Sequence, residues 1–197
     1  MKVVIIFNHP YEGSFCNAVL QAVTSGLQKA NAEVDLIHLD KEGFNPVMTA
    51  ADLKAFRDKK PVDRKVIEYS ERIKQADHLI FIFPIWWELM PALTKGFVDK
   101  VIFPGAAYDY INTSNTRMKP LWNNLKTVTM ITTMNTPNWL YWLLFGNAIK
   151  KAMILGTFWK IGFKKRKWIS FNMVKMVSQE KRISWLQRLE NRFAQLR

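Results

Sequence analysis

Cysteine is almost absent from this sequence. Cys16 is the single cysteine among 197 residues, so no internal disulfide can form and a disulfide-stapled secreted domain is excluded. Glycine and proline are scarce too, at eight each, which excludes collagen-like and Pro/Gly-rich low-complexity chains. We therefore expect a globular protein in a reducing compartment, the cytoplasm. The 49% hydrophobic share predicts a sizeable core in a single domain over residues 1–197.

Long apolar runs are missing as well. Met1 and Lys2 precede only the short apolar run 3–7, which is too brief for the core of a signal peptide. The most apolar later stretch, 139–145, is followed by Lys150 and Lys151 and is far shorter than the ~20 residues that cross a bilayer. The sequence therefore predicts no transmembrane segment.

Negative charge is nearly absent from the second part of the chain. Residues 117–197 contain 16 Lys and Arg but only Glu180 and Glu190, whereas residues 1–116 contain 13 basic and 14 acidic residues. Most of the net charge of +13 therefore belongs to one part of the chain. A positive field of this kind attracts a phosphorylated small molecule, a nucleic acid or an anionic membrane, and charge alone does not choose among them.

Short apolar runs alternate with amphipathic segments along the chain. The strands are predicted at 1–7, 34–39, 78–83, 128–132 and 168–173. The helices are predicted after Ser14, from near Thr49, over 64–75, from Pro91 to about Lys100, over 138–155 and after Ser178. Near-continuous apolar strands that alternate with helices are typical of a parallel sheet covered on both faces. The fold class is therefore α/β, a doubly wound sheet.

In such sheets ligands bind beyond the carboxyl ends of the strands, here at the loops 8–17, 84–90 and 132–138. The first loop opens into a helix, whose free N–H groups favour a phosphate, with the Ser14 hydroxyl and the His9 ring as further donors. It carries neither GxGxxG nor GK[ST], which disfavours a Rossmann dinucleotide site and a P-loop. Alternatively, Ser14 only caps the helix and His9 bonds to a neighbouring carbonyl.

Aromatic side chains mark two other segments. Trp86 and Trp87 follow a buried strand, which suits the lining of a flat ring system, or equally the packing of a helix or a subunit interface. Tyr108 and Tyr110 either cover a pocket or form a strand edge. The hydroxyls after the fourth strand, at Thr132 and Thr133, can address a carbonyl rim.

Taken together, these loops resemble the NAD(P)H dehydrogenase (quinone) family, the flavodoxin-like two-electron reductases related to DT-diaphorase. The resemblance spans about residues 1–133. The matching pieces are HPYEGSFCNA (9–18), FNP (44–46), ADHLIFIFPIWWELMPALTKGFVDKVI (76–102), the AYDY tyrosines and TT at 132–133. Where many members continue Thr-Thr-Gly-Gly, this chain has Met134 and Asn135 after its two threonines.

The resemblance implies a flavodoxin-like fold of five parallel strands in the order 2-1-3-4-5 that binds a flavin, FAD rather than FMN, although FMN is possible. It implies that NAD(P)H and a quinone or similar acceptor react in ping-pong order, and that the protein is a homodimer whose site the second subunit completes. The cofactor-binding residues that it implies are His9, Ser14, Phe15, Cys16, Asn17, Pro84, Ile85, Trp86, Trp87, Thr132, Thr133 and Met134. The catalytic residues that it implies are Trp87, Tyr108 and Tyr110.

Other chemistries find less support in the residues. His9, His38 and His78 lie on separate predicted elements, so we expect no metal site. The segment 139–168 combines Trp with Lys, and its run 160–167 has the composition of a nucleic-acid or anionic-lipid surface. A nucleic-acid- or anionic-membrane-binding module on the same scaffold is therefore the alternative function. No recognised nucleic-acid motif accompanies the run, and we expect no nucleic-acid partner.

Overall fold

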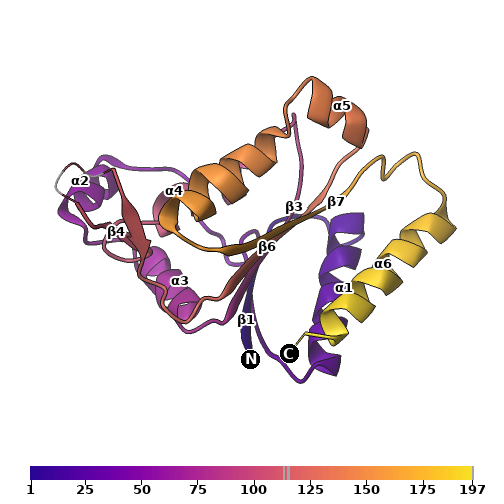
Figure 1. Ribbon diagram of the computed structural model, residues 1–197, viewed down its shortest axis with the longest axis horizontal. Coiled ribbons are helices and arrows are strands. Elements are labelled where there is room, and N and C mark those ends of the chain that lie inside the picture. Colours follow the sequence, from indigo (N-terminus) through magenta and orange to yellow (C-terminus); the bar gives the residue numbers. More distant parts are fainter. Residues whose placement is uncertain (113, 115, 197) are drawn as a thin grey trace.

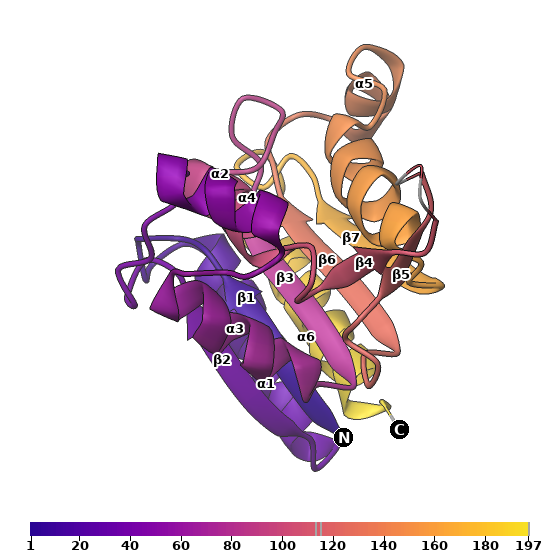
Figure 2. The same cartoon turned by 90° about the vertical axis from the view of Figure 1, so that its left-hand side faces the viewer.

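Five parallel strands form the central sheet of the protein. The computed structural model describes residues 1–112, 114 and 116–196. The strands lie in the order β2-β1-β3-β6-β7, which is 2-1-3-4-5 when only the sheet strands are counted, as predicted (Figures 1 and 2). Their bounds are Lys2–Phe7 for β1, Glu33–His38 for β2, His78–Pro84 for β3, Thr127–Thr133 for β6 and Lys165–Phe171 for β7.

Helices cover both faces of this sheet. Figure 1 shows α1 (Phe15–Lys29) and α6 (Gln179–Ala194) on one face, and α3 (Arg64–Lys74), α4 (Ala92–Val101) and η1 (Lys150–Trp159) on the other. Because successive side chains of a strand point to opposite faces, Val3 and Ile5 pack beneath α1 and α6 whereas Val4 and Ile6 pack on the other side. The continuous apolar run of β1 therefore supplies both cores, which is why it shows no alternation.

The helix α1 begins where the sequence predicts. Ser14 is its N-cap, and the Ser14 Oγ accepts a hydrogen bond from the Asn17 N–H at 3.1 Å. The helix continues through Gly26 to Lys29. A Cβ atom at Gly26 would lie 2.4 Å from the Glu190 carbonyl oxygen, so the glycine allows α1 and α6 to approach closely.

The excursion between β2 and α3 contains the predicted short helix, α2 (Ala50–Asp58), and Thr49 and Asp52 form its capping box. It is held against α4 by the FNP motif. A Cβ atom at Gly96 would lie 2.4 Å from the Pro46 carbonyl oxygen, and the Lys100 Nζ lies 2.7 Å from the Asp63 carboxylate. The close approach of Gly96 to Pro46 and the ion pair of Lys100 with Asp63 therefore hold the excursion against α4.

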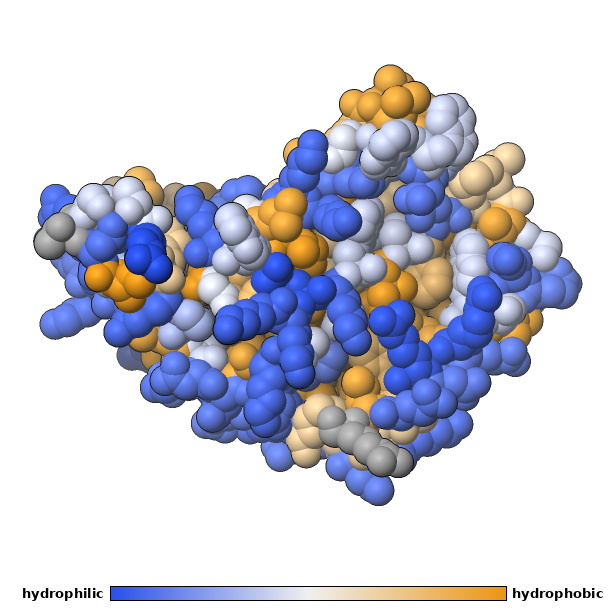
Figure 3. All heavy atoms as spheres, viewed as in Figure 1, coloured by the Kyte–Doolittle hydropathy of each residue, from blue (hydrophilic) through white to orange (hydrophobic). Residues whose placement is uncertain are grey.

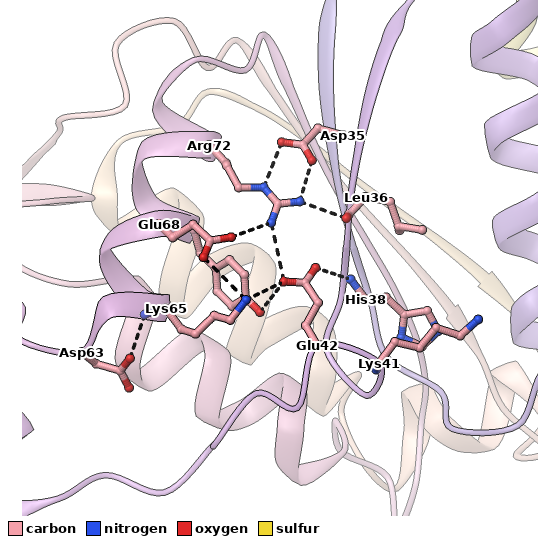
Figure 4. Close-up of polar contacts among 10 residues, drawn as sticks. Asp35, Leu36, His38, Lys41, Glu42, Asp63, Lys65, Glu68 and Arg72 are labelled. Atoms are coloured by element: carbon pink, nitrogen blue, oxygen red, sulfur yellow. Dashed lines mark hydrogen bonds and ion pairs between the residues drawn. The ribbon is translucent and has the colours of Figure 1, made fainter.

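Charged side chains tie α3 to the edge strand β2. Arg72 donates two hydrogen bonds to the Asp35 carboxylate, and Glu42 accepts one from the Tyr69 hydroxyl at 3.0 Å (Figure 4). The Arg72 pKa lies above its usual value, chiefly because of the hydrogen bond to Asp35. These ion pairs hold α3 to the edge strand of the sheet.

The segment after β6 differs from the prediction of one helix over 138–155. The helix α5 spans only Asn138–Leu143, and Gly146 and Asn147 take positive φ angles of 57° and 55° before η1 begins. Residues with positive φ end an α-helix. The chain then continues in the wider π-helical form of η1, in which Thr157 donates its hydroxyl hydrogen to the Ala152 carbonyl, five residues earlier.

The last strand was predicted at 168–173, three residues too late. Its first half consists mainly of lysine and arginine, and Lys165 and Lys167 are exposed whereas Trp168 packs inward. The strand β7 lies at the edge of the sheet and pairs only with β6 within it. Basic residues on its solvent side do not disturb this pairing, and they disfavour the addition of a strand from another molecule.

Tyr108 and Tyr110 belong to a strand. The strand β4 (Tyr108–Tyr110) pairs antiparallel with β5 (Met118–Pro120), so the predicted strand is present. The role of the two tyrosines as the cover of a pocket stays a prediction. Among the residues that the structure describes, none of the helices is long and apolar enough to cross a membrane.

Candidate functional site

A pocket of about 390 Å³ lies at the carboxyl ends of β1, β3 and β6. The chain leaves β1 towards β2 on one side and returns to β3 on the other, so the pocket lies at the switch point of the sheet. Its volume is within the range of small-molecule sites. The lining residues are His9, Ser14, Phe15, Cys16, Pro84, Ile85, Trp86, Thr133, Met134, Asn135, Val174 and Lys175.

Hydrogen-bond donors converge at the end of the pocket formed by the β1–α1 loop. The first N–H groups of α1 have no acceptor inside the helix and carry its positive dipole end. The Ser14 Oγ already accepts from the Asn17 N–H, which leaves its hydrogen to donate. The His9 Nδ1 accepts from the Tyr11 N–H at 3.1 Å, so a neutral His9 carries its hydrogen on Nε2. This arrangement suits an anion.

A tight turn over 86–89 forms another wall. The Trp86 and Leu89 backbones exchange hydrogen bonds of 3.0 and 3.1 Å, and Trp87 and Glu88 between them have φ angles of 49° and 63°. Positive φ at both central residues is the geometry of a type I′ turn. This backbone conformation has a steric cost for bulky residues such as tryptophan and none for glycine. The Tyr141 hydroxyl donates to the Glu88 carbonyl at 2.8 Å and holds this turn against α5.

Thr132 and Thr133 lie on opposite faces of the sheet. Thr133 lines the pocket, whereas the Thr132 hydroxyl accepts from the Trp168 Nε1 at 2.9 Å and lies 3.3 Å from the Ser170 hydroxyl. Adjacent residues of a strand cannot face the same side. Thr132 therefore does not line this pocket, and its cofactor-binding role stays a prediction.

Cys16 is buried in the pocket wall. Its side chain is 2% exposed, and burial raises the pKa of its thiol to about 12. A thiol with such a pKa stays protonated at neutral pH and is a poor nucleophile. The geometry therefore favours a packing role for Cys16 over a redox role.

The sequence reasoning missed the loop that follows β7. Val174 and Lys175 line the pocket, and the loop is bonded to the end of β6 by the Val174 N–H to the Met134 carbonyl and by the Lys175 N–H to the Asn135 Oδ1. The predicted last strand was the signal that could have found this loop. In a parallel sheet the loops that follow the strands lie at the same edge, where ligands bind. Lys175 adds a cation to the pocket.

Several predicted site residues are not brought to the pocket. The Asn17 amide nitrogen donates to the Glu12 carbonyl within the loop, and the Trp87 side chain is 98% exposed. Tyr108 and Tyr110 pack edge to face at 5.7 Å on β4, and neither lines the pocket. Burial, followed by the hydrogen bond with Tyr110, raises the Tyr108 pKa above its usual value. The catalytic roles of Trp87, Tyr108 and Tyr110 stay predictions.

The histidines outside the pocket have structural surroundings. The His78 Nε2 lies 2.8 Å from the Thr129 hydroxyl in the core, and the His38 ring packs edge to face on Phe7 at 4.9 Å. Within the described ranges 1–112, 114 and 116–196, no group of three or more His, Cys, Asp or Glu side chains is placed to hold a metal ion.

Comparison with known proteins finds a matching family model and several similar chains. A family model described as a flavodoxin-like fold matches residues 1–194. An uncharacterized NAD(P)H oxidoreductase of Escherichia coli is 28% identical over 108 residues, which cover 54% of this chain and 55% of that protein. A ribosyldihydronicotinamide dehydrogenase [quinone] of Rattus norvegicus is 27% identical over 125 residues, covering 55% of this chain and 54% of that protein. The chain thus matches about half the length of these curated relatives.

A solved structure matches over nearly its whole length. The NAD(P)H:quinone oxidoreductase from Methanothermobacter marburgensis is 25% identical to this chain, with a TM-score of 0.88, and the match covers 100% of this chain and 99% of the other.

Proposed function

Since the chain belongs to the flavodoxin-like fold family, we propose that it is a flavin-dependent NAD(P)H oxidoreductase. In this proposal it passes two electrons, as a hydride, from NAD(P)H to a quinone or a similar acceptor, and the two substrates use the same site in ping-pong order. The names of the relatives support the class of reaction. The observation that carries the proposal is the switch-point pocket, which has anion donors at one end and aromatic walls beside them.

The donor set fits the phosphate of a flavin. The N-terminus of α1, the Ser14 hydroxyl, the His9 Nε2–H and the Lys175 ammonium provide uncharged and charged donors around one end of the pocket. Phosphates bind well at such helix ends, and an added lysine contributes charge. In this reading Phe15 and Cys16 contribute their backbone N–H groups, and Asn17 holds the loop through its bond to Glu12.

The loop after β3 fits one side of a flat ring system. Trp86 is 46% exposed and its ring packs edge to face on His9, with the ring centroids 6.0 Å apart. The Ile85 N–H donates to the Thr133 carbonyl and the Trp86 N–H to the Leu89 carbonyl. The N–H of Trp87 at the tip of the turn is therefore the group of this loop that we expect to address the ring. We expect Pro84, Thr133 and Met134 to line the remaining walls.

A bound flavin would accept and donate the hydride, which none of the side chains of this chain can do. The residues of this chain would bind and orient it, and the Trp87 N–H, which we expect to address the ring, would stabilise the negative charge of the reduced ring. The positive surroundings of the pocket also favour the phosphates of NAD(P)H. Tyr108 and Tyr110, or a residue of a second subunit, remain our candidates for the wall on the substrate side.

The test is spectroscopic. Purified protein, alone or after addition of FAD or FMN, should show the visible absorbance of oxidised flavin and should bleach when NADPH or NADH is added without oxygen. Mass spectrometry of the released cofactor distinguishes FAD from FMN. A colourless protein that binds neither flavin overturns the proposal.

Variants locate the binding site. Ser14→Ala and Lys175→Ala should each weaken flavin binding about tenfold, because each removes a donor to a charged oxygen. Lys54→Ala, an exposed lysine on α2, is the matched control and should bind flavin as the wild type does. Equal affinity in all these variants would contradict the placement of the phosphate.

We also propose a homodimer, as in the family that the sequence resembles. Sedimentation velocity of the flavin-loaded protein measures its oligomeric state, and a monomer at all concentrations would contradict it.

A further inference from the structure

A second cavity lies at the opposite end of the sheet from the switch-point pocket. It has a volume of about 430 Å³ and lies where β3, β6 and β7 begin, whereas the switch-point pocket lies at the carboxyl ends of the strands. The seven residues of β3 place the two ends about 20 Å apart. The residues that line this amino-end cavity are Met1, Asp77, His78, Lys126, Thr127, Lys165, Lys167 and Leu196.

Polar side chains from three neighbouring strands meet at this cavity. His78 pairs with Thr127, and Thr127 pairs with Lys165, so these side chains form one row across the sheet. Thr129 and Lys167 are the next paired residues on the same face. The following residue on this face of each of the three strands is an isoleucine, which packs in or against the core beneath α1 and α6. Isoleucine thus gives way to histidine, threonine and lysine at the cavity.

Positive charge exceeds negative charge in this cavity. The Lys126 Nζ lies 2.8 Å from the Asp77 carboxylate, so these two charges form a pair. Among the described residues that line the cavity, Asp77 is the single acid. Lys165 and Lys167 are exposed to solvent, and Figure 3 shows hydrophilic residues gathered where Figure 1 places β7. The two lysines of β7 therefore add positive charge that no lining carboxylate balances.

His78 lies in the wall of the cavity next to these lysines. It is 4% exposed, and its ring stacks on Phe193 with the centroids 6.4 Å apart. Its Nε2 lies 2.8 Å from the Thr129 hydroxyl. Burial, followed by the charge of Lys167, lowers the pKa of His78 to about 4. Because the ring responds to a charge on β7, it is a natural reporter for an ion that binds there.

We propose that the amino-end cavity binds a small phosphate ester. The Lys165 and Lys167 ammonium groups and the Thr127 hydroxyl bind the phosphate oxygens, since lysine and threonine are both donors to charged oxygens. The uncharged part of the ester packs against Met1 and Leu196, the apolar residues of the lining. All of these residues belong to one chain, so neither a flavin nor a second subunit is needed to form the site.

The size of the cavity favours a small molecule over a nucleic acid. Its volume lies within the range of small-molecule sites. Proteins that bind single strands instead carry a long basic groove with aromatic side chains on which the bases stack. Among the described residues that line this cavity, none is Trp, Tyr or Phe. A nucleic acid is therefore an alternative that the experiment has to exclude.

The experiment is an NMR titration of the full chain, with any cofactor that it carries, in which the ring signals of the histidines are followed. Inorganic phosphate and phenyl phosphate should each shift the His78 signals in a saturable way, and sodium chloride at equal ionic strength should not. Phenyl phosphate should bind about tenfold more tightly, because its ring also loses contact with water. Signals of His9, which lines the switch-point pocket, report binding there separately.

Variants locate the phosphate. Lys165→Gln/Lys167→Gln should lower the affinity for phenyl phosphate, measured at His78, at least about tenfold, because two charge-assisted contacts are lost. Lys54→Gln/Lys60→Gln is the matched control, since these lysines are also exposed, and it should keep the affinity. Lys175→Ala changes the switch-point pocket and should leave the His78 response as it is in the wild type. Urea denaturation shows whether each variant is folded.

Three results overturn the proposal. The first is a His78 signal that neither phosphate compound shifts, or that chloride shifts equally. The second is an equal loss of affinity in the control variants. The third is a response of His78 to a single-stranded oligonucleotide without one to phenyl phosphate. Because neither flavin binding nor turnover is measured, failure of the proposed function leaves this result intact.

Discussion

The thiol of Cys16 shows how burial changes the chemistry of one residue. From the sequence, a lone cysteine in a ligand loop is compatible with packing or with redox chemistry. In the structure it is 2% exposed and its pKa is raised to about 12, so the reactive thiolate is nearly absent at neutral pH. The choice between the two roles thus depends on a neighbourhood that only folding creates.

We predict that iodoacetamide labels Cys16 at least about a hundredfold more slowly in the native protein at pH 7.5 than in guanidinium chloride. Mass spectrometry of timed samples measures the two rates. The unfolded chain is the control because its thiol has an ordinary pKa. Native labelling as fast as unfolded labelling would contradict the burial.

Trp87 is a second residue with unusual surroundings. Its φ is 49° and its side chain is 98% exposed, so it contributes backbone strain and little apolar burial. Trp87→Gly should raise the free energy of unfolding by about 1 kcal/mol, because glycine adopts this conformation without a steric cost. Urea denaturation measures the change. Leu89→Gly in the same turn, where φ is not positive, should instead lower stability.

Among the elements, buried strands and capped helices were predictable from the sequence, whereas the bounds of β7 and α5 were not. The strand over 78–84 is buried at every position, so its composition alone marks it. By contrast β7 begins with exposed lysines, and α5 ends at Leu143, shortly before Gly146 and Asn147 take positive φ angles. An apolar run does not mark the start of β7, and the apolar composition of 138–155 does not show where the chain turns.

Gly26 tests a contact between two elements. In an isolated helix Gly→Ala stabilises by about 1 kcal/mol. Here the added methyl would lie 2.4 Å from the Glu190 carbonyl oxygen of α6, so Gly26→Ala should lower the free energy of unfolding by about 1–3 kcal/mol. Thermal and urea denaturation give the sign. Gln21→Ala and Gln28→Ala, on the exposed side of α1, are controls expected to be neutral or slightly stabilising.

For the whole molecule, His78 links stability to pH. Burial, with a smaller effect of Lys167, lowers the pKa of His78 from 6.5 to about 4. Between these values the unfolded chain binds a proton that the folded protein does not, so stability falls as pH decreases from 6.5 to 4. This group contributes up to about 3 kcal/mol of that loss.

His78→Gln should therefore lose less stability than the wild type between pH 7 and 4.5, measured as the urea midpoint at each pH. Carboxylates titrate in both proteins and cancel in the difference between them. Identical pH dependence in the two proteins would show that His78 is not buried as a neutral ring.

The sequence by itself determined the doubly wound sheet, because near-continuous apolar strands that alternate with helices are typical of a parallel sheet covered on both faces. It also determined the helix start at Ser14, because capping is a local interaction. Only the tertiary structure decided which candidates meet at the pocket. Thr133 faces it and Thr132 does not, since a strand alternates its faces, and Lys175 joins it from the end of a distant strand. Local patterns specify elements, whereas a site is formed by residues that become neighbours when the sheet assembles.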